Sequence, residues 1–140
     1  EMRVTQVDKR ERKVETAKER EAWEAREFGD ADADTLVVSW GSNEGAIVEA
    51  MELLAEEGID VRFISVPYIF PRPDLGDAID DAEDVLVVEC NSTGQFADLI
   101  ERDALARVDR INKYNGVRFK ADELAAEIEQ AVSSPQEVPQ

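Results

Sequence analysis

The sequence predicts a three-layer α/β domain in which helices cover both faces of a mostly parallel sheet. From Thr35 onward, short apolar runs alternate with longer amphipathic segments. Short runs rich in β-branched residues indicate buried strands, and apolar residues at helical spacing indicate helices. Parallel strands need a crossover connection, usually a helix, so this alternation favours a parallel sheet. The length of 140 residues fits a single domain of this kind.

Residues 1–34 form a charged N-terminal segment and linker that differ from the rest of the chain. Basic and acidic side chains alternate densely here, and the apolar residues are few: Val4, Val7, Val14, Ala17, Trp23 and Phe28. This pattern predicts a mainly polar helix that lies along another surface. The stretch GDADAD at 29–34 is expected to be a polar linker.

Residues 35–132 are predicted to form the α/β domain, and residues 133–140 a frayed tail. We expect strands at 35–40, 61–66, 84–90 and 108–111. We expect helices at 44–57, around 75–79, from 95 onward, and over 124–132. The first strand should lie in the centre, between the second and the third, with the fourth outside the third. Right-handed crossovers then place the helices that begin near Glu44 and Gln95 on opposite faces of the sheet.

The chain is strongly acidic, with 33 Asp and Glu residues against 16 Lys and Arg residues and a net charge of −17. Nucleic acids and anionic membranes attract basic proteins, so we expect neither as a partner. Only five of the basic residues are lysine. Acid-rich, lysine-poor surfaces are typical of proteins from salt-loving microbes, where salt screens the self-repulsion. We therefore interpret the chain as halophilic, and an acidic domain from an ordinary organism is the alternative.

Targeting and membrane segments are not evident in the sequence. Its apolar runs are too short for a transmembrane helix or a signal peptide, so we expect a cytoplasmic protein. The first residue is Glu1 rather than methionine, which suggests a fragment of a longer protein.

The sequence offers few residues for catalysis or metal binding. It has no histidine, which is the commonest general base and metal ligand. Cys90 is its single cysteine, which excludes an internal disulfide and a cysteine-built zinc or iron–sulfur site. We assign no catalytic, cofactor-binding or metal-binding residue, and we expect Cys90 to be a buried packing residue.

Two polar loops follow predicted strands and are the candidate ligand or contact sites. The first contains Trp40, Gly41, Ser42 and Glu44. Phosphates bind at such strand-to-helix turns, but the turn lacks a Walker A or G-x-G-x-x-G pattern. Glu44 also places negative charge where a phosphate would lie, so a tight helix-entry turn is the better interpretation.

The second polar loop contains Glu89, Asn91, Ser92, Gly94 and Gln95. If its strand neighbours the one at 35–40, the two loops meet where the winding of the sheet reverses, which is where open α/β sheets bind ligands. The loop could form a ligand pocket or a subunit contact. The alternative is a helix cap, in which Ser92 and Gln95 form a capping box and backbone donors satisfy Glu89.

A third candidate is an aromatic loop between prolines that contains Tyr68 and Phe70. Aromatic residues are enriched in interface cores, so an exposed loop here would indicate a contact surface. The two rings could equally cover the core of their own domain.

Three blocks of residues match a known family in both order and spacing. They are VVSWGS at 37–42 with Gly45, Ala46, Glu49 and Ala50; VVE at 87–89 with Asn91, Gly94, Gln95 and 97–99; and KYNG at 113–116 with Phe119. These blocks resemble the C-terminal domain of the alpha subunit of 2-oxoacid:ferredoxin oxidoreductases. The run KRERK at 9–13 is similar to the basic stretch that precedes this domain in those subunits.

The resemblance implies a transketolase C-terminal-like fold and a non-catalytic domain that supports subunit contacts. The full enzymes decarboxylate a 2-oxoacid oxidatively to an acyl-coenzyme A. They use thiamine diphosphate, magnesium, coenzyme A and an iron–sulfur cluster, and they pass electrons to ferredoxin. The implied partners are other domains of the alpha subunit and a thiamine-diphosphate-binding beta subunit. The sequence itself carries no G-D-G thiamine-diphosphate motif.

Two other interpretations stay open at this point. One is a stand-alone acidic binding or regulatory domain, for which Lys113 lies near a receiver-like position. However, a phosphoacceptor aspartate is missing at the end of the strand at 35–40. The other is the equivalent domain of a transketolase or a 2-oxoacid dehydrogenase. The sequence does not distinguish pyruvate, 2-oxoglutarate and a branched oxoacid as the substrate.

Overall fold

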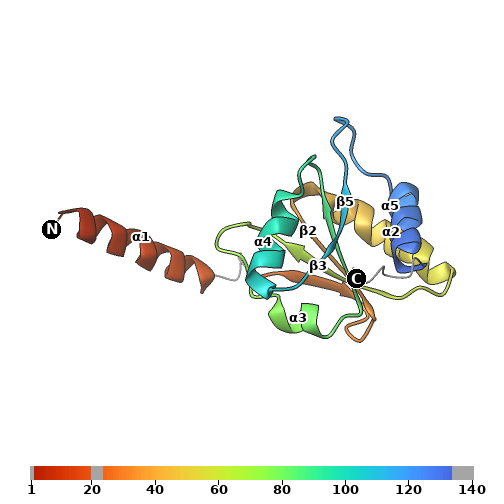
Figure 1. Cartoon of the computed structure of the whole chain (residues 1–140), viewed down its shortest axis with the longest axis horizontal. Coiled ribbons are helices and arrows are strands. Elements are labelled where there is room, and N and C mark those ends of the chain that lie inside the picture. The colour runs from red at the N-terminus through yellow and green to blue at the C-terminus, as the bar shows by residue number, and fades with distance from the viewer. Residues whose placement is uncertain (1, 20–23, 134–140) are drawn as a thin grey trace, which may run out of the picture.

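A five-stranded sheet forms the centre of the computed structural model, which describes residues 2–19 and 24–133 (Figure 1). The strands are β1 (Arg26–Gly29), β2 (Thr35–Trp40), β3 (Val61–Val66), β4 (Asp84–Glu89) and β5 (Asp109–Asn112). Their order is β1-β3-β2-β4-β5, in which β1 alone pairs antiparallel among these strands. The predicted order of the four main strands is therefore confirmed.

Helices cover both faces of this sheet. Their bounds are α1 (Met2–Lys18), α2 (Glu44–Glu56), α3 (Gly76–Asp80), α4 (Gln95–Ala104) and α5 (Ala121–Ser133). Alternate residues of β2 point to opposite sides: Leu36 packs in the core beneath α3 and α4, and Val37 in the core beneath α2 and α5. Burial on both faces explains why the central strands are continuous apolar runs. The predicted opposite placement of α2 and α4 is confirmed.

The strand β1 lies in the segment that we expected to be helix and linker, so that expectation was wrong for Arg26–Gly29. Phe28 stacks on Phe63 of β3, with 5.5 Å between ring centroids. Gly29 has a φ of +83°, and a Cβ there would lie 2.1 Å from the carbonyl oxygen of Val61. A glycine is thus required where β1 ends beside β3.

The predicted N-terminal polar helix is present as α1, which projects from the domain (Figure 1). It has no buried residue, so the surface along which it was expected to lie is not found among the described residues. The expected anchor Trp23 and the tail from 134 onward lie outside the described residues. None of the helices in the described ranges has the length and apolar character needed to cross a bilayer.

Candidate functional site: the carboxyl edge of the sheet

The carboxyl ends of β2, β3 and β4 carry all the candidate site residues predicted from the sequence. The central strand β2 pairs with β3 on one side and β4 on the other, both in parallel. From β2 the chain enters α2 on one face, and from β4 it enters α4 on the other. The two polar loops therefore meet at the point where the winding reverses, as expected.

The loop after β2 is a helix-entry turn. Gly41 has a φ of +77°, Gly41–Asn43 form one turn of 3₁₀ helix, and α2 begins at Glu44. The Glu44 carboxylate Oε2 lies 2.6 Å from Nη2 of Arg26 at the start of β1. A carboxylate at a helix N-terminus is favourable, and here it takes the place that an incoming anion would need. The arrangement agrees with the tight-turn interpretation rather than with phosphate binding.

The loop after β4 is organised by Glu89, which is fully buried. Its carboxylate accepts hydrogen bonds from the backbone N–H groups of Phe96 and Ala97, at 3.0 and 3.1 Å, and from the Asn91 side-chain amide. Glu89 thus satisfies two of the free donors in the first turn of α4. The interpretation of Glu89 as a carboxylate held by backbone donors agrees with this geometry.

The predicted capping box of Ser92 and Gln95 was wrong. The residue that precedes α4 is Gly94, whose φ of +68° is left-handed, and it makes no side-chain cap. The Asn91 side-chain carbonyl instead accepts from the backbone N–H groups of Thr93 and Gly94, which closes the loop. A Cβ on Gly94 would lie 2.7 Å from Nη1 at the flexible end of the Arg110 side chain, so the left-handed φ is the main reason for glycine here.

A chain of polar side chains joins the two loops. The Ser39 hydroxyl donates to the carbonyl oxygen of Val88, and the Asn43 amide donates to the Ser39 oxygen. The Cys90 thiol lies 3.2 Å from the Asn43 amide oxygen. Cys90 is exposed, so its expected burial was wrong. These polar atoms therefore form hydrogen bonds within the fold and connect the two loops.

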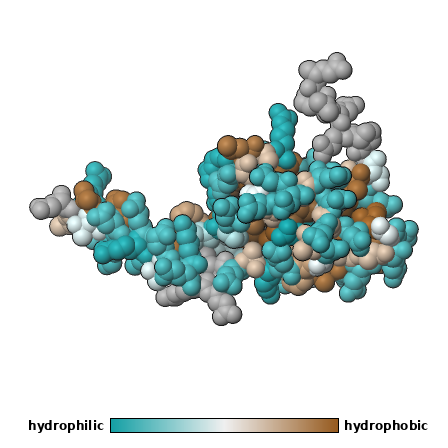
Figure 2. Space-filling view, turned by 90° about the horizontal axis from the view of Figure 1, so that it is seen from below, coloured by the Kyte–Doolittle hydropathy of each residue, from teal (hydrophilic) through white to brown (hydrophobic). Residues whose placement is uncertain are grey.

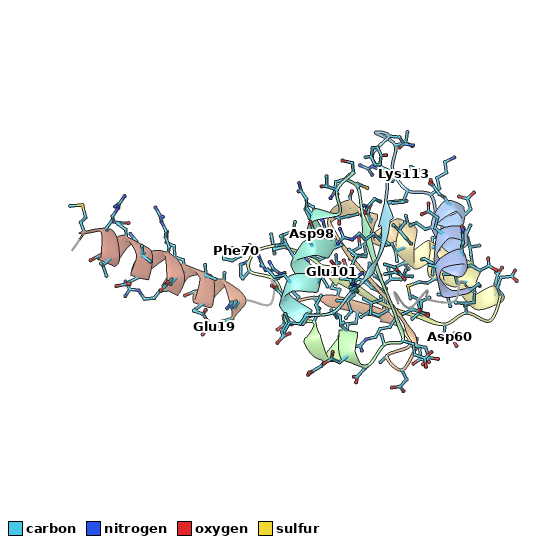
Figure 3. All side chains as sticks on the ribbon, in the orientation of Figure 1. Glu19, Asp60, Phe70, Asp98, Glu101 and Lys113 are labelled. Atoms are coloured by element: carbon cyan, nitrogen blue, oxygen red, sulfur yellow. The ribbon has the colours of Figure 1, made fainter. Side chains whose placement is uncertain are left out.

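Aromatic side chains at the same edge remain exposed. The exposed fractions are 37% for Trp40, 44% for Tyr68, 71% for Phe70 and 73% for Tyr114. The Trp40 ring contacts the Phe96 ring, with 6.4 Å between the ring centroids. Figure 3 shows Phe70 on a loop that extends from the domain toward α1. Tyr114 follows β5 and was not among the predicted site residues. The carboxyl edge therefore combines a hydrogen-bonded polar centre with exposed aromatic rings, and aromatic residues are enriched in protein interfaces.

A hollow of about 530 Å³ lies beside this edge, between the start of α2 and the segment before α5. Its lining carries both signs of charge: Glu49 and Asp122 face it together with Arg118 and Lys120. This mixed charge favours no single class of ionic ligand.

The Lys113 ammonium ties the loop after β5 to α5. It lies 2.5 Å from the Glu123 carboxylate and donates a second hydrogen bond to the carbonyl oxygen of Arg118. The hydrogen bond from Lys113 is the main reason that the pKa of Glu123 lies below its ordinary value. A lowered carboxylate pKa adds stability above the ordinary carboxyl pKa, and this stability is lost as the pH falls through the folded-state value.

We expect the substitution Lys113→Met to raise the pKa of Glu123 toward its ordinary value. A carbon-detected NMR titration of the Glu123 carboxyl measures this shift directly. Lys120→Met is the matched control, because residue 120 contacts Glu123 only through its backbone N–H. An unchanged Glu123 pKa in Lys113→Met would contradict the assignment.

The comparisons with known proteins agree with the architecture. A family model described as pyruvate:ferredoxin oxidoreductase core domain II matches residues 33–124. The chain belongs to this family. A relative from Aeropyrum pernix, the alpha subunit of 2-oxoacid:ferredoxin oxidoreductase 2, is 33% identical over 97% of this chain and 22% of its own length. The chain thus spans about a fifth of the length of the curated relatives that it matches.

Solved structures show the same fold for this core domain. The 2-oxoglutarate:ferredoxin oxidoreductase from Magnetococcus marinus matches 79% of this chain and 20% of its own, with a TM-score of 0.72 and 23% identity. A transketolase from Pichia stipitis matches 80% of this chain and 18% of its own, with a TM-score of 0.59 and 18% identity. The expected transketolase C-terminal-like fold is confirmed.

Proposed function

We propose that this chain is a non-catalytic C-terminal domain of the alpha subunit of a 2-oxoacid:ferredoxin oxidoreductase, and that it carries contacts with other parts of the enzyme. The observation that supports this function is the contrast between buried polar groups and exposed aromatic rings at the carboxyl edge. The polar groups at the switch point, Glu89 above all, are engaged within the fold, whereas aromatic rings around them are exposed. Both carboxylate oxygens of Glu89 accept hydrogen bonds, and a buried polar group whose partners are in place stabilises the fold around it.

The complete enzyme would supply the chemistry. We propose that it decarboxylates a 2-oxoacid to an acyl-coenzyme A with thiamine diphosphate, magnesium and an iron–sulfur cluster, and reduces ferredoxin. The partners of this domain would be other domains of the alpha subunit and a thiamine-diphosphate-binding beta subunit. The residues proposed to meet them are the accessible members of the two switch-point loops and the exposed aromatic rings: Trp40, Gly41, Ser42, Glu44, Tyr68, Phe70, Asn91, Ser92, Gln95 and Tyr114. The buried Glu89 and Gly94 would hold the second loop in shape beneath them.

We further propose a halophilic, cytoplasmic setting for this enzyme. The excess of acidic residues and the scarcity of lysine support a surface adapted to concentrated salt. The test of this proposal is the salt dependence of stability, which is treated in the Discussion.

The double substitution Phe70→Ser and Tyr114→Ser in the complete subunit is expected to weaken its assembly with its partner. Truncating interface aromatic anchors costs about 2 kcal/mol or more, which is roughly a thirtyfold change in affinity. Copurification with the tagged partner and 2-oxoacid-dependent ferredoxin reduction measure the loss. Both rings are largely exposed in this domain, so the melting temperature of the domain should stay close to that of the parent.

The control is Leu105→Ser, because Leu105 is an exposed apolar residue that follows α4, at the edge of the sheet opposite the aromatic rings. It should leave assembly unchanged. Equal losses in the control and the double variant would contradict a specific contact at the carboxyl edge. Calorimetry of this chain with thiamine diphosphate and magnesium provides a second check, since micromolar binding would contradict a non-catalytic domain.

A further inference from the structure

The helix α1 differs from the rest of the chain in charge and in burial. Its residues, Met2–Lys18, include six basic and three acidic side chains, whereas the remainder of the chain holds ten basic and thirty acidic ones. None of its residues is buried, and Figure 2 shows apolar side chains exposed among polar ones along it. Most of the stability of helices in proteins comes from packing against other surfaces, so a surface that packs against α1 would stabilise it.

One face of α1 has the character of a docking face. At 100° per residue, Val4, Val7, Val14 and Ala17 fall within one sector of the helix. Arg3, Arg10 and Lys18 share this sector with a single acidic residue, Glu11. Cations and small apolar side chains are thus interspersed in this sector, which matches a surface of carboxylates and small residues.

Such a surface lies at the amino edge of the sheet, opposite the carboxyl edge. Thr35 pairs with Val61 and with Asp84, so the loops that precede β2, β3 and β4 meet there. These loops and the adjoining ends of α2, α3 and β4, at 30–34, 56–60 and 80–84, hold ten acidic and no basic residues. We call this surface the acidic edge.

The acidic edge contains a hollow of about 280 Å³. Four alanines line it, Ala31, Ala33, Ala78 and Ala82, together with Asp32, Asp81 and Arg62. The Arg62 guanidinium is already paired with the Glu27 carboxylate of β1, at 3.0 Å. Asp32 and Asp81 thus lie beside small alanine side chains in a hollow whose exposed lining is mainly polar, so charge pairing would provide most of the contact with α1.

The helix and the acidic edge lie at opposite ends of one molecule. β1 runs antiparallel to β3, so Arg26, which pairs with Ser65, starts β1 at the carboxyl edge. Figure 3 shows Glu19, at the end of α1, on the far side of the domain from Asp60 in the acidic edge. In this arrangement α1 does not lie against the acidic edge of its own chain, so we consider the acidic edge of a second molecule.

We propose that α1 of one chain docks on the acidic edge of a second copy, with its small apolar side chains over the alanine-lined hollow and its arginines beside Asp32 and Asp81. This interaction goes beyond the proposed function, since it does not involve the carboxyl edge. Because the docking helix and its receptor surface lie at opposite ends of the molecule, the contact is head-to-tail.

Sedimentation equilibrium of this 140-residue chain tests the proposal, in potassium chloride at a concentration where circular dichroism shows a folded chain. We expect reversible association of the parent. The variant Arg3→Glu with Arg10→Glu should raise the dissociation constant at least about tenfold, which corresponds to about 1.4 kcal/mol. The control, Lys9→Glu with Arg12→Glu, makes the same change in net charge on the opposite side of α1 and should associate as the parent does.

A charge exchange gives the decisive arm of this experiment. A second chain with Asp32→Lys and Asp81→Lys should also fail to self-associate. Mixing it with the Arg3→Glu, Arg10→Glu chain should restore association, because the charges become complementary again. A monomeric parent at all concentrations, equal weakening in the control pair, or a mixture that stays monomeric would overturn the proposal.

Discussion

Replacing Glu89 with alanine should lower the free energy of unfolding of this domain by at least about 3 kcal/mol. The substitution leaves the backbone N–H groups of Phe96 and Ala97 without their acceptor, in a site closed to solvent. Each buried donor without a partner costs about 1–3 kcal/mol, and the lost side chain also leaves a cavity. Since a domain has only about 5–15 kcal/mol of net stability, the loss should be visible as a large shift in the urea midpoint.

Two comparisons make this expectation specific to the carboxylate. Glu89→Gln keeps the shape of the side chain and one acceptor oxygen, but its amide nitrogen faces a backbone donor. Its free energy of unfolding should therefore lie between that of the parent and that of Glu89→Ala. Glu129→Ala removes an exposed carboxylate on α5 and should change the free energy of unfolding by no more than about 0.5 kcal/mol. A Glu89→Ala midpoint equal to that of the Glu129→Ala control would show that the buried carboxylate does not hold the first turn of α4.

The central sheet was predictable because each of its strands is marked by an apolar run in the local sequence, and the runs recur at regular spacing. β2, β3 and β4 are each six residues long, and burial on both faces makes them nearly continuous apolar runs. Chirality then restricts the order in which such strands can pair. β1 lacks such a run, because it contains only four residues and one apolar side chain, Phe28. Its place depends on Phe63 and on the close approach of Gly29 to Val61, which are contacts between distant parts of the chain.

The candidate site was predictable in position but not in its bonding. Turn residues after apolar runs correctly indicated the two loops. The capping box failed because the acceptor for α4 comes from Glu89, at the end of the preceding strand, rather than from the local Ser92. The link from Ser39 through Asn43 to Cys90 was missed for a similar reason, although a serine within an apolar strand is a usable indication of a buried polar contact. Local sequence patterns do not reveal hydrogen bonds that link side chains from different strands.

The melting temperature of the chain should rise by at least about 10 °C between dilute buffer and molar potassium chloride, if the proposed halophilic adaptation holds. Ten carboxylates gather at the acidic edge without a basic residue in the same loops, and the whole chain carries a net charge of −17. The Debye length falls from ~10 Å at 0.1 M salt to ~3 Å at 1 M, so neighbouring carboxylates cease to repel one another. Each exposed pair contributes about a few tenths of a kcal/mol, and many pairs act together.

Thermal melts followed by circular dichroism across a series of chloride concentrations measure this effect. Chloride is preferred to sulfate, because sulfate also strengthens the burial of apolar surface and would raise the melting temperature of any domain. The matched variant carries Asp80→Asn, Asp81→Asn and Glu83→Gln, which keep the shape of the acidic edge and remove three exposed charges. Less repulsion remains to be screened in this variant, so its melting temperature should start higher in dilute buffer and rise less steeply with salt. Parallel curves for parent and variant would mean that repulsion at the acidic edge does not limit the stability of the fold, and a flat parent curve would refute the halophilic proposal itself.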